Sequence, residues 1–194
     1  MRPFSQSIAL ALIAALSAFG TSASAAPVAY ALQKENSVVG FSWTLGPDEV
    51  TGSMPVADAD ISIDLEQLEN TRVNVSLDVA NAVAGFPFAT QGMKSERVLW
   101  VEEHPRITFT STAIARQDEG ARVDGLLTVR GITRPVVFDA RLFRQQGTEP
   151  GDRRLLSIIV TGRLLRSDFG ADGWSGLAGD EVRLTIVARL ERME

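Results

Sequence analysis

Residues 106–143 read RITFTSTAIARQDEGARVDGLLTVRGITRPVVFDARLF. Apolar residues alternate with polar ones over most of this stretch, which is the pattern of strands with one apolar face. Residues that favour turns interrupt the alternation at 118–120 (DEG) and at 131–133 (GIT). The stretch therefore predicts three consecutive strands joined by short turns.

The same alternation recurs on both sides of this stretch, at residues 39–44, 57–64, 72–79, 155–165 and 181–190. A polar loop at 145–152 and a glycine-rich loop at 170–179 separate the later runs. About eight strand-like runs with short connections indicate an all-β domain, either a closed antiparallel barrel or a sandwich. We favour an eight-stranded antiparallel β-barrel, because closure removes exposed strand edges. The interior of such a barrel fills with side chains or holds one small ligand.

Two segments break the alternation. Residues 65–70 fit one helical turn, and residues 87–101 fit a short helix or an irregular crossover. The second segment lies in a long connection between the runs that end near Val79 and begin at Arg106. Long connections in small domains are often functional, and we expect this one to lie over the opening of a cavity.

The first 25 residues have the features of a secretory signal peptide. Arg2 precedes an apolar run at 8–19, and the small residues Ala23-Ser24-Ala25 form an A-x-A cleavage site. The apolar run is shorter than the roughly 20 residues of a membrane span, so an uncleaved anchor is the less favoured alternative. We therefore predict a signal peptide at 1–25, a single β-barrel domain at 26–194 and a periplasmic location.

Composition excludes several classes of function. The formal net charge of −5 gives no electrostatic attraction to nucleic acid or to anionic lipid surfaces. The chain has no cysteine, which rules out thiol chemistry and thiolate metal sites.

No convincing catalytic or metal-binding constellation is present. His104 is the only histidine, and no G-x-S-x-G motif is available to present a nucleophile. Asp58, Asp60 and Asp64 are spaced to lie on one strand face, where we expect a solvated surface and not a metal site. Asp168 is expected to bond the backbone of its turn. We predict no catalytic residues, no metal and no cofactor.

Five segments resemble the YceI-like family of periplasmic lipid- or polyisoprenoid-binding proteins. The strongest resemblance is GLLTVRGITRPV at 125–136, similar to the family's G-x-L-T-(I/V)-R-G-(V/I)-T-(K/R)-P-V. The others, in chain order, are 30–42, 93–112, LRSDFG at 165–170 and GDEV at 179–182. The resemblance implies a lipocalin-like barrel with a long internal channel that binds an amphiphile non-covalently. Departures from the family pattern fall at 85–92 and 98–100, at His104 in place of a tyrosine and at Leu165 in place of an asparagine.

Apolar side chains, mostly aromatic, are the candidate ligand contacts, since apolar walls with few polar groups define a ligand pocket. Ordinary core packing is the alternative for each of them. The set comprises Phe41, Trp43, Phe86, Phe88, Met93, Leu99, Trp100, Phe109, Phe169 and Trp174. A polar head group at the mouth is expected to lie near Arg130, Arg134 or Arg166.

The sequence as a whole predicts a periplasmic protein, monomeric or homodimeric, that sequesters or carries a polyisoprenoid, quinone-like or fatty-acyl ligand. The alternative is an enzyme or electron-transfer accessory that acts on quinone or lipid with a cytochrome-b561-type membrane partner, the partner class that the resemblance implies. An integral outer-membrane barrel is disfavoured, because acidic residues alternate on the strand faces where an apolar band is required.

Overall fold

The computed structural model describes residues 26–143 and 147–194, so the predicted signal peptide lies outside the described residues. One α-helix is described, α1 (Pro87–Lys94), with three short 3-10 helices, η1 (Lys34–Asn36), η2 (Leu68–Asn70) and η3 (Arg166–Phe169). The described strands are β1 (Val28–Leu32), β2 (Val38–Leu45), β3 (Asp48–Met54), β4 (Val56–Ile63), β5 (Arg72–Asp78), β6 (Val83–Ala84), β7 (Arg106–Gln117), β8 (Gly120–Val129), β9 (Ile132–Phe143), β10 (Leu155–Leu165) and β11 (Glu181–Arg192).

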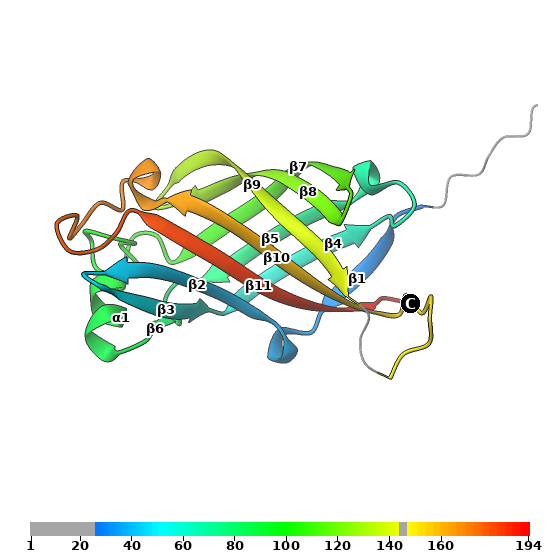
Figure 1. Ribbon diagram of the computed structural model, residues 1–194, viewed down its shortest axis with the longest axis horizontal. Coiled ribbons are helices and arrows are strands. Elements are labelled where there is room, and N and C mark those ends of the chain that lie inside the picture. Colours follow the sequence, from blue (N-terminus) through cyan, green and yellow to red (C-terminus); the bar gives the residue numbers. More distant parts are fainter. Residues whose placement is uncertain (1–25, 144–146) are drawn as a thin grey trace, which may run out of the picture.

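These strands close into one antiparallel barrel of eight positions, which confirms the predicted fold (Figure 1). The closing strand is β11, which pairs with β1 near its end and with β2 along its first half. β1 and β2 thus occupy one position, interrupted by η1. β3 and β4 together occupy the neighbouring position in the barrel, because β3 pairs with β2 and β4 pairs with β1. Their break falls at Pro55, which has no N–H to donate to a ladder.

The central hairpins follow from local sequence. Arg130 and Gly131 join β8 to β9, and both have left-handed backbone, with φ of 50° and 73°. Positive φ at both central residues is the requirement of a two-residue type I′ hairpin, whose twist matches that of the flanking strands. This turn fixes the register of β8 against β9, with Val129 opposite Ile132.

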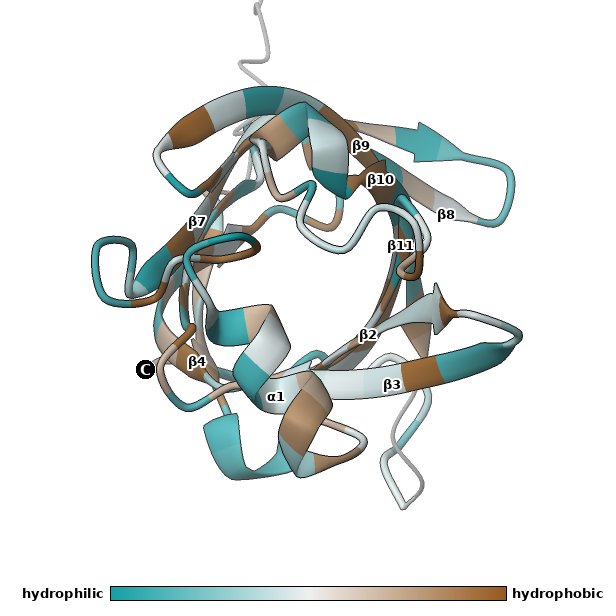
Figure 2. Ribbon diagram, turned by 90° about the vertical axis from the view of Figure 1, so that its left-hand side faces the viewer, coloured by the Kyte–Doolittle hydropathy of each residue, from teal (hydrophilic) through white to brown (hydrophobic). Residues whose placement is uncertain are grey.

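The long connection between β5 and β7 carries β6 and α1, and Figure 2 shows α1 at the rim of one end of the barrel. Pro87 stands at the first position of α1, where its missing N–H costs nothing. The helix ends at Lys94 because Ser95 is extended and its Oγ donates to the carbonyl oxygen of Gly92 (2.6 Å). The predicted helix within 87–101 is therefore confirmed for its first half, and turns follow it.

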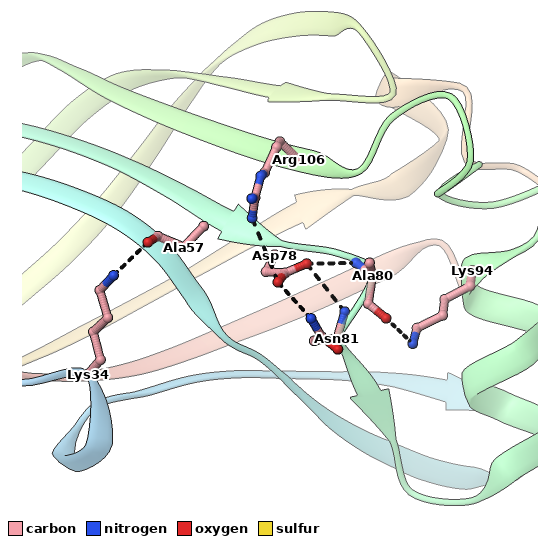
Figure 3. A network of polar contacts seen from close by, with 7 residues as sticks. All are labelled: Lys34, Ala57, Asp78, Ala80, Asn81, Lys94 and Arg106. Atoms are coloured by element: carbon pink, nitrogen blue, oxygen red, sulfur yellow. Dashed lines mark hydrogen bonds and ion pairs between the residues drawn. The ribbon is translucent and has the colours of Figure 1, made fainter.

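A polar network fixes the start of this connection at the end of β5 (Figure 3). The carboxylate of Asp78 accepts hydrogen bonds from the backbone N–H of Ala80 (3.1 Å) and from the Asn81 side chain (2.8 Å). Lys94 reaches back from α1, and its Nζ donates to the carbonyl oxygen of Ala80 (2.5 Å). Arg106 at the start of β7 lies 3.8 Å from the same carboxylate. The connection is thereby tied to both strands that it joins.

Buried apolar residues form three clusters on the barrel wall. The cluster near α1 contains Val79 and Phe169, which are 0% and 2% exposed. A second, at the far end, contains Leu156 and Leu190, and the third lies around Phe138. Each cluster joins neighbouring strands, so the wall is packed strand against strand around the lumen.

Within residues 26–143 and 147–194, no helix is long and apolar enough to cross a membrane.

Asp64 is not on the solvated strand face that its spacing predicts, because β4 ends at Ile63. The residue is buried, and its carboxylate accepts hydrogen bonds from the backbone N–H groups of Glu66 (3.0 Å) and Gln67 (2.9 Å) and from the Asn70 side chain (3.1 Å). These bonds, that from Gln67 foremost, lower the pKa of Asp64. The prediction for Asp64 is therefore wrong: it organises the β4–β5 loop.

Replacing Asp64 is expected to remove an acid-sensitive part of the stability. A carboxyl whose pKa is lowered by folding stabilises the native state above its unfolded pKa, about 3.9, and this stability is lost as pH falls through the folded value. Asp64→Asn should have a lower free energy of unfolding than the parent at pH 7, and the difference between the two proteins should become smaller in acid. Urea unfolding at pH 7 and pH 3 measures this, with Asp58→Asn on the exposed face of β4 as the control. A gap that is equal at both pH values would contradict the assignment.

Candidate binding cavity in the barrel

The barrel encloses a cavity of about 1010 Å³. Apolar side chains at alternate positions form its wall, for example Leu156, Ile158 and Val160 on β10 and Leu184 and Ile186 on β11. This volume is at the upper end of the range of about 300–1,000 Å³ for small-molecule pockets. The inward faces of the predicted strands thus line a lumen large enough for a ligand.

The cavity runs along most of the barrel. On β10 its wall includes both Leu155 and Leu164, a span of about 30 Å at about 3.3 Å per residue. With a strand tilt of about 40°, that span corresponds to about 23 Å along the barrel axis. The exposed side chains of Phe88 and Trp174 border the cavity at the α1 end, and exposed Phe143 borders it at the other. This shape suits an elongated molecule.

Three inward-facing glycines keep aromatic rings against the wall. Phe41 lies opposite Gly52, Phe138 opposite Gly162, and Phe109 diagonally across from Gly125. A Cβ atom added to any of these glycines would stand 2.2–2.5 Å from the nearest ring atom. Each ring therefore occupies the place of its neighbour's missing side chain and lies along the sheet. We infer that these pairs leave the axis of the barrel free.

Most of the sequence-predicted ligand contacts lie on the cavity wall. Eight of the ten do so: Phe41, Trp43, Phe88, Met93, Leu99, Phe109, Phe169 and Trp174. Phe41 and Trp43 stack with ring centroids 5.9 Å apart. Their placement brings them together around one lumen, and their contact with a ligand stays a prediction.

Phe86 and Trp100 do not line this cavity. Phe86 precedes α1 and is 41% exposed. Trp100 has left-handed backbone (φ 47°), and its ring packs edge-on against His104, with centroids 5.6 Å apart. The guanidinium of Arg130 lies 6.0 Å from the same ring. The structure thus places Trp100 and the only histidine in a surface cluster beside the mouth.

The three arginines predicted near a head group hold loops at the α1 end. Arg130 donates to the carbonyl oxygens of Val98 (3.0 Å) and Gly170 (2.8 Å), and Arg134 donates to that of Asp168 (3.1 Å). Of the three, only Arg166 borders the cavity. Its buried guanidinium donates to four carbonyl oxygens, those of Ala171, Gly173, Ala178 and Gly179. These contacts shape the glycine-rich loop, and head-group binding by the three arginines stays a prediction.

The turn at Ser167 is held by Asp180 and not by Asp168. The Asp180 carboxylate accepts bonds from the backbone N–H (2.9 Å) and hydroxyl (2.7 Å) of Ser167, and the hydroxyl bond is the main cause of its lowered pKa. Asp168 is exposed and contributes its backbone carbonyl oxygen to Arg134. The described residues contain no group of three or more His, Cys, Asp or Glu side chains placed to hold a metal ion.

The predicted site lacked the aliphatic wall and four charged residues that border the cavity, Arg116, Arg141, Asp152 and Arg153. Leu77, Leu127 and Leu164 line the lumen together with the aromatic residues. Alternation within their strands is the signal that could have identified them. Arg116 also lines it, at the end far from α1. Alternation counted from Ile107 places Arg116 outside, so nothing in the pattern pointed to it.

The fold and the cavity together define a class of protein, the closed antiparallel barrels with an apolar lumen. The match to the family model for the YceI-like domain covers residues 30–190, and the chain belongs to this family. It is 28% identical over 148 residues to a UPF0312 protein of Serratia proteamaculans and 26% identical to protein YceI of Salmonella arizonae. Each alignment covers 76% of this chain, with 73% and 74% of the relative.

Solved structures share the fold at lower sequence identity. BcnA of Burkholderia cenocepacia superposes with a TM-score of 0.69 and 17% identity, over 82% of this chain and 99% of that one. A YceI protein of Campylobacter jejuni superposes with a TM-score of 0.61 and 20% identity, over 74% and 85%. The identification as a YceI-like barrel, predicted from the sequence, is confirmed.

The Gly162–Phe138 pair gives a direct test of the wall geometry. A Cβ at Gly162 would stand 2.2 Å from the Phe138 ring, so Gly162→Ala must push the ring away from the wall. We expect Gly162→Ala to destabilise the protein and Phe138→Ala to relieve the clash. Their coupling energy in a double-mutant cycle should be of order 1 kcal/mol, as for residues in direct contact. Urea unfolding of the four proteins measures it, and additive effects would contradict the geometry.

Proposed function

We propose that this protein binds one long-chain apolar or amphiphilic molecule in the barrel lumen and carries or sequesters it in the periplasm. The observation that carries the proposal is the cavity of about 1010 Å³, whose wall is apolar along most of its length. Membership of the YceI-like family supports a binding protein of this kind. Polyisoprenoid, quinone-like and fatty-acyl chains are the ligand classes that fit an apolar channel about 23 Å long.

The physical gain from binding is the removal of the chain from water. Burial contributes about 0.8 kcal/mol per CH₂ group before the costs of association and ordering are subtracted. A long hydrocarbon chain is too insoluble to cross an aqueous compartment alone. A closed apolar lumen lowers that barrier, because the chain stays out of water during transfer.

The periplasmic part of the proposal rests on the amino-terminal sequence. Cleavage after Ala25 would release a chain that begins at Ala26. Amino-terminal sequencing of the protein from a bacterial periplasmic extract is expected to begin within a residue or two of Ala26. A membrane-bound product that retains Met1 would contradict export in this form.

A fluorescence titration tests the binding proposal. The neutral, environment-sensitive probe N-phenyl-1-naphthylamine is added to solvent-delipidated protein, and hexadecanol is then used to displace it. We expect saturable fluorescence enhancement at one probe per chain and full displacement by the alcohol. An absence of saturable binding by folded, delipidated protein would overturn the proposal.

Trp43→Ala is expected to weaken binding more than it weakens the fold. Trp43 borders the cavity, so its removal should cost less stability than the roughly 3–5 kcal/mol of a packed tryptophan. The lost aromatic contact should reduce hexadecanol affinity roughly two- to tenfold. Displacement titration and thermal melting of the delipidated variant give the two readouts.

Trp100→Ala is the matched comparison, because Trp100 lies outside the cavity wall. It should leave affinity near the parent value while it loosens the turn around His104. If Trp43→Ala melts far below the parent yet binds hexadecanol equally well, Trp43 is a core residue and not a ligand contact. Delipidated protein is required throughout, since bound ligand itself raises the melting temperature.

A further inference from the structure

The two ends of the lumen differ in charge. At the α1 end, the arginine on the wall is Arg166, whose N–H groups are directed at loop carbonyls. At the far end, the wall includes three arginines, Arg116 of β7, Arg141 of β9 and Arg153 just before β10. It also includes one carboxylate, Asp152, which is paired with Arg154 (3.0 Å). An elongated cavity with an apolar interior and arginines at one end matches an amphiphile with an anionic head group.

A β-bulge turns Arg116 inward. The register between β7 and β8 shifts between Ser111 and Ala113, so Thr112 is an extra residue in β7. Before the bulge, Ile107 and Phe109 line the lumen, and after it Ile114 and Arg116 do. Without the extra residue the face would reverse and Arg116 would point outward.

A partly buried hydrogen bond holds the bulge. The Oγ of Ser111 accepts the backbone N–H of Val73 on the adjacent strand β5 (2.9 Å), and Ser111 is 9% exposed. This bond replaces a regular ladder contact at the point where the register shifts. The inward position of Arg116 is therefore built into the barrel wall.

Most of the hydrogen-bonding capacity of Arg116 is available to a ligand. One of its amino groups, Nη2, donates to the carbonyl oxygen of Leu65 (3.0 Å), which ties the exposed side chain to the loop after β4. None of the ion pairs among the described residues involves Arg116. Arg153, by contrast, is paired with Glu66 (2.7 Å). Arg141, the third arginine on the wall at this end, pairs with Glu119 (3.0 Å). Among the far-end wall arginines, Arg116 is thus the one outside the ion pairs of the described residues.

We propose that Arg116 binds the anionic head group, a carboxylate or a phosphate, of an amphiphile whose hydrocarbon chain lies in the lumen. The proposal rests on the proposed function and adds the chemical class of the ligand and its direction. The planar guanidinium matches both kinds of oxyanion and binds them with two parallel hydrogen bonds. Entry tail-first at this end spares the charged head a passage through the apolar lumen, where an unpaired charge is very costly.

Displacement of N-phenyl-1-naphthylamine at pH 8 tests the assignment with three ligands of equal chain length, hexadecanoate, hexadecyl phosphate and hexadecanol. The parent should bind at least one of the two anions more tightly than the alcohol. Arg116→Gln should lower the affinity for that anion roughly ten- to a hundredfold, as expected for the loss of a charge-assisted hydrogen bond. The affinity for hexadecanol should stay at the parent value. Arg116→Lys should recover part of the loss. Comparing the carboxylate with the phosphate shows which head group the site prefers.

Arg122→Gln is the matched control. Arg122 lies on the outer face of β8, directly opposite Ala115, and pairs with Asp124 (2.7 Å), so the same charge is removed at the same end of the barrel but outside the lumen. Arg122→Gln should bind hexadecanoate, hexadecyl phosphate and hexadecanol with the affinities of the parent. The proposal is overturned if Arg116→Gln binds both anions as the parent does, or if Arg134→Gln at the opposite mouth produces the loss instead. Failure of the neutral probe to bind would reject the proposed function itself.

Discussion

Closure of the sheet on β11 is the constraint on which the rest of the structure depends. β11 pairs with β10 along its whole length and with β1 and β2 on its other side. Once the ring is closed, each strand must present one face to the lumen and the other to the surroundings. Apolar burial then takes place on the inner wall, in three clusters around the cavity. The interior remains open because inward glycines let aromatic rings lie along the sheet.

Side-chain bonds to backbone carbonyls and amides shape the two ends of the barrel. Arg166 and Arg130 hold the glycine-rich loop and the crossover at the α1 end, and Asp64 holds the β4–β5 loop at the other. Apolar contacts of Phe169 and Leu65 with the wall clusters add to these polar bonds. A charged side chain at the edge of this lumen has a structural role when loop carbonyls take up its donors, as they do at buried Arg166. Arg116 differs from Arg166 because it donates to one loop carbonyl, whereas Arg166 donates to four.

Strand positions and the barrel were predictable because alternation is a local property that each strand carries by itself. A turn between β8 and β9 was also predicted, at residues 131–133, whereas the hairpin turn of the structure is formed by Arg130 and Gly131, and Ile132 begins β9. The bulge near Thr112 was not predictable, since it depends on Ser111 meeting Val73 from a distant segment. The buried position of Asp64 likewise depends on where β4 ends, one residue earlier than the pattern indicates. Trp100 was expected across the opening, but its left-handed backbone turns it toward His104. The apolar residues of the candidate site were thus predicted from the sequence. The arginines at its far end were not predicted.

Native mass spectrometry tests the central claim, that the lumen holds one hydrocarbon chain, most directly. The protein would be taken from a bacterial periplasm without delipidation and measured under conditions that preserve non-covalent complexes. We expect an added mass equal to one lipid per chain, lost after solvent extraction and regained after incubation with vesicles of bacterial lipids. Detection of the bare chain mass alone, before extraction and after incubation with vesicles, would contradict it.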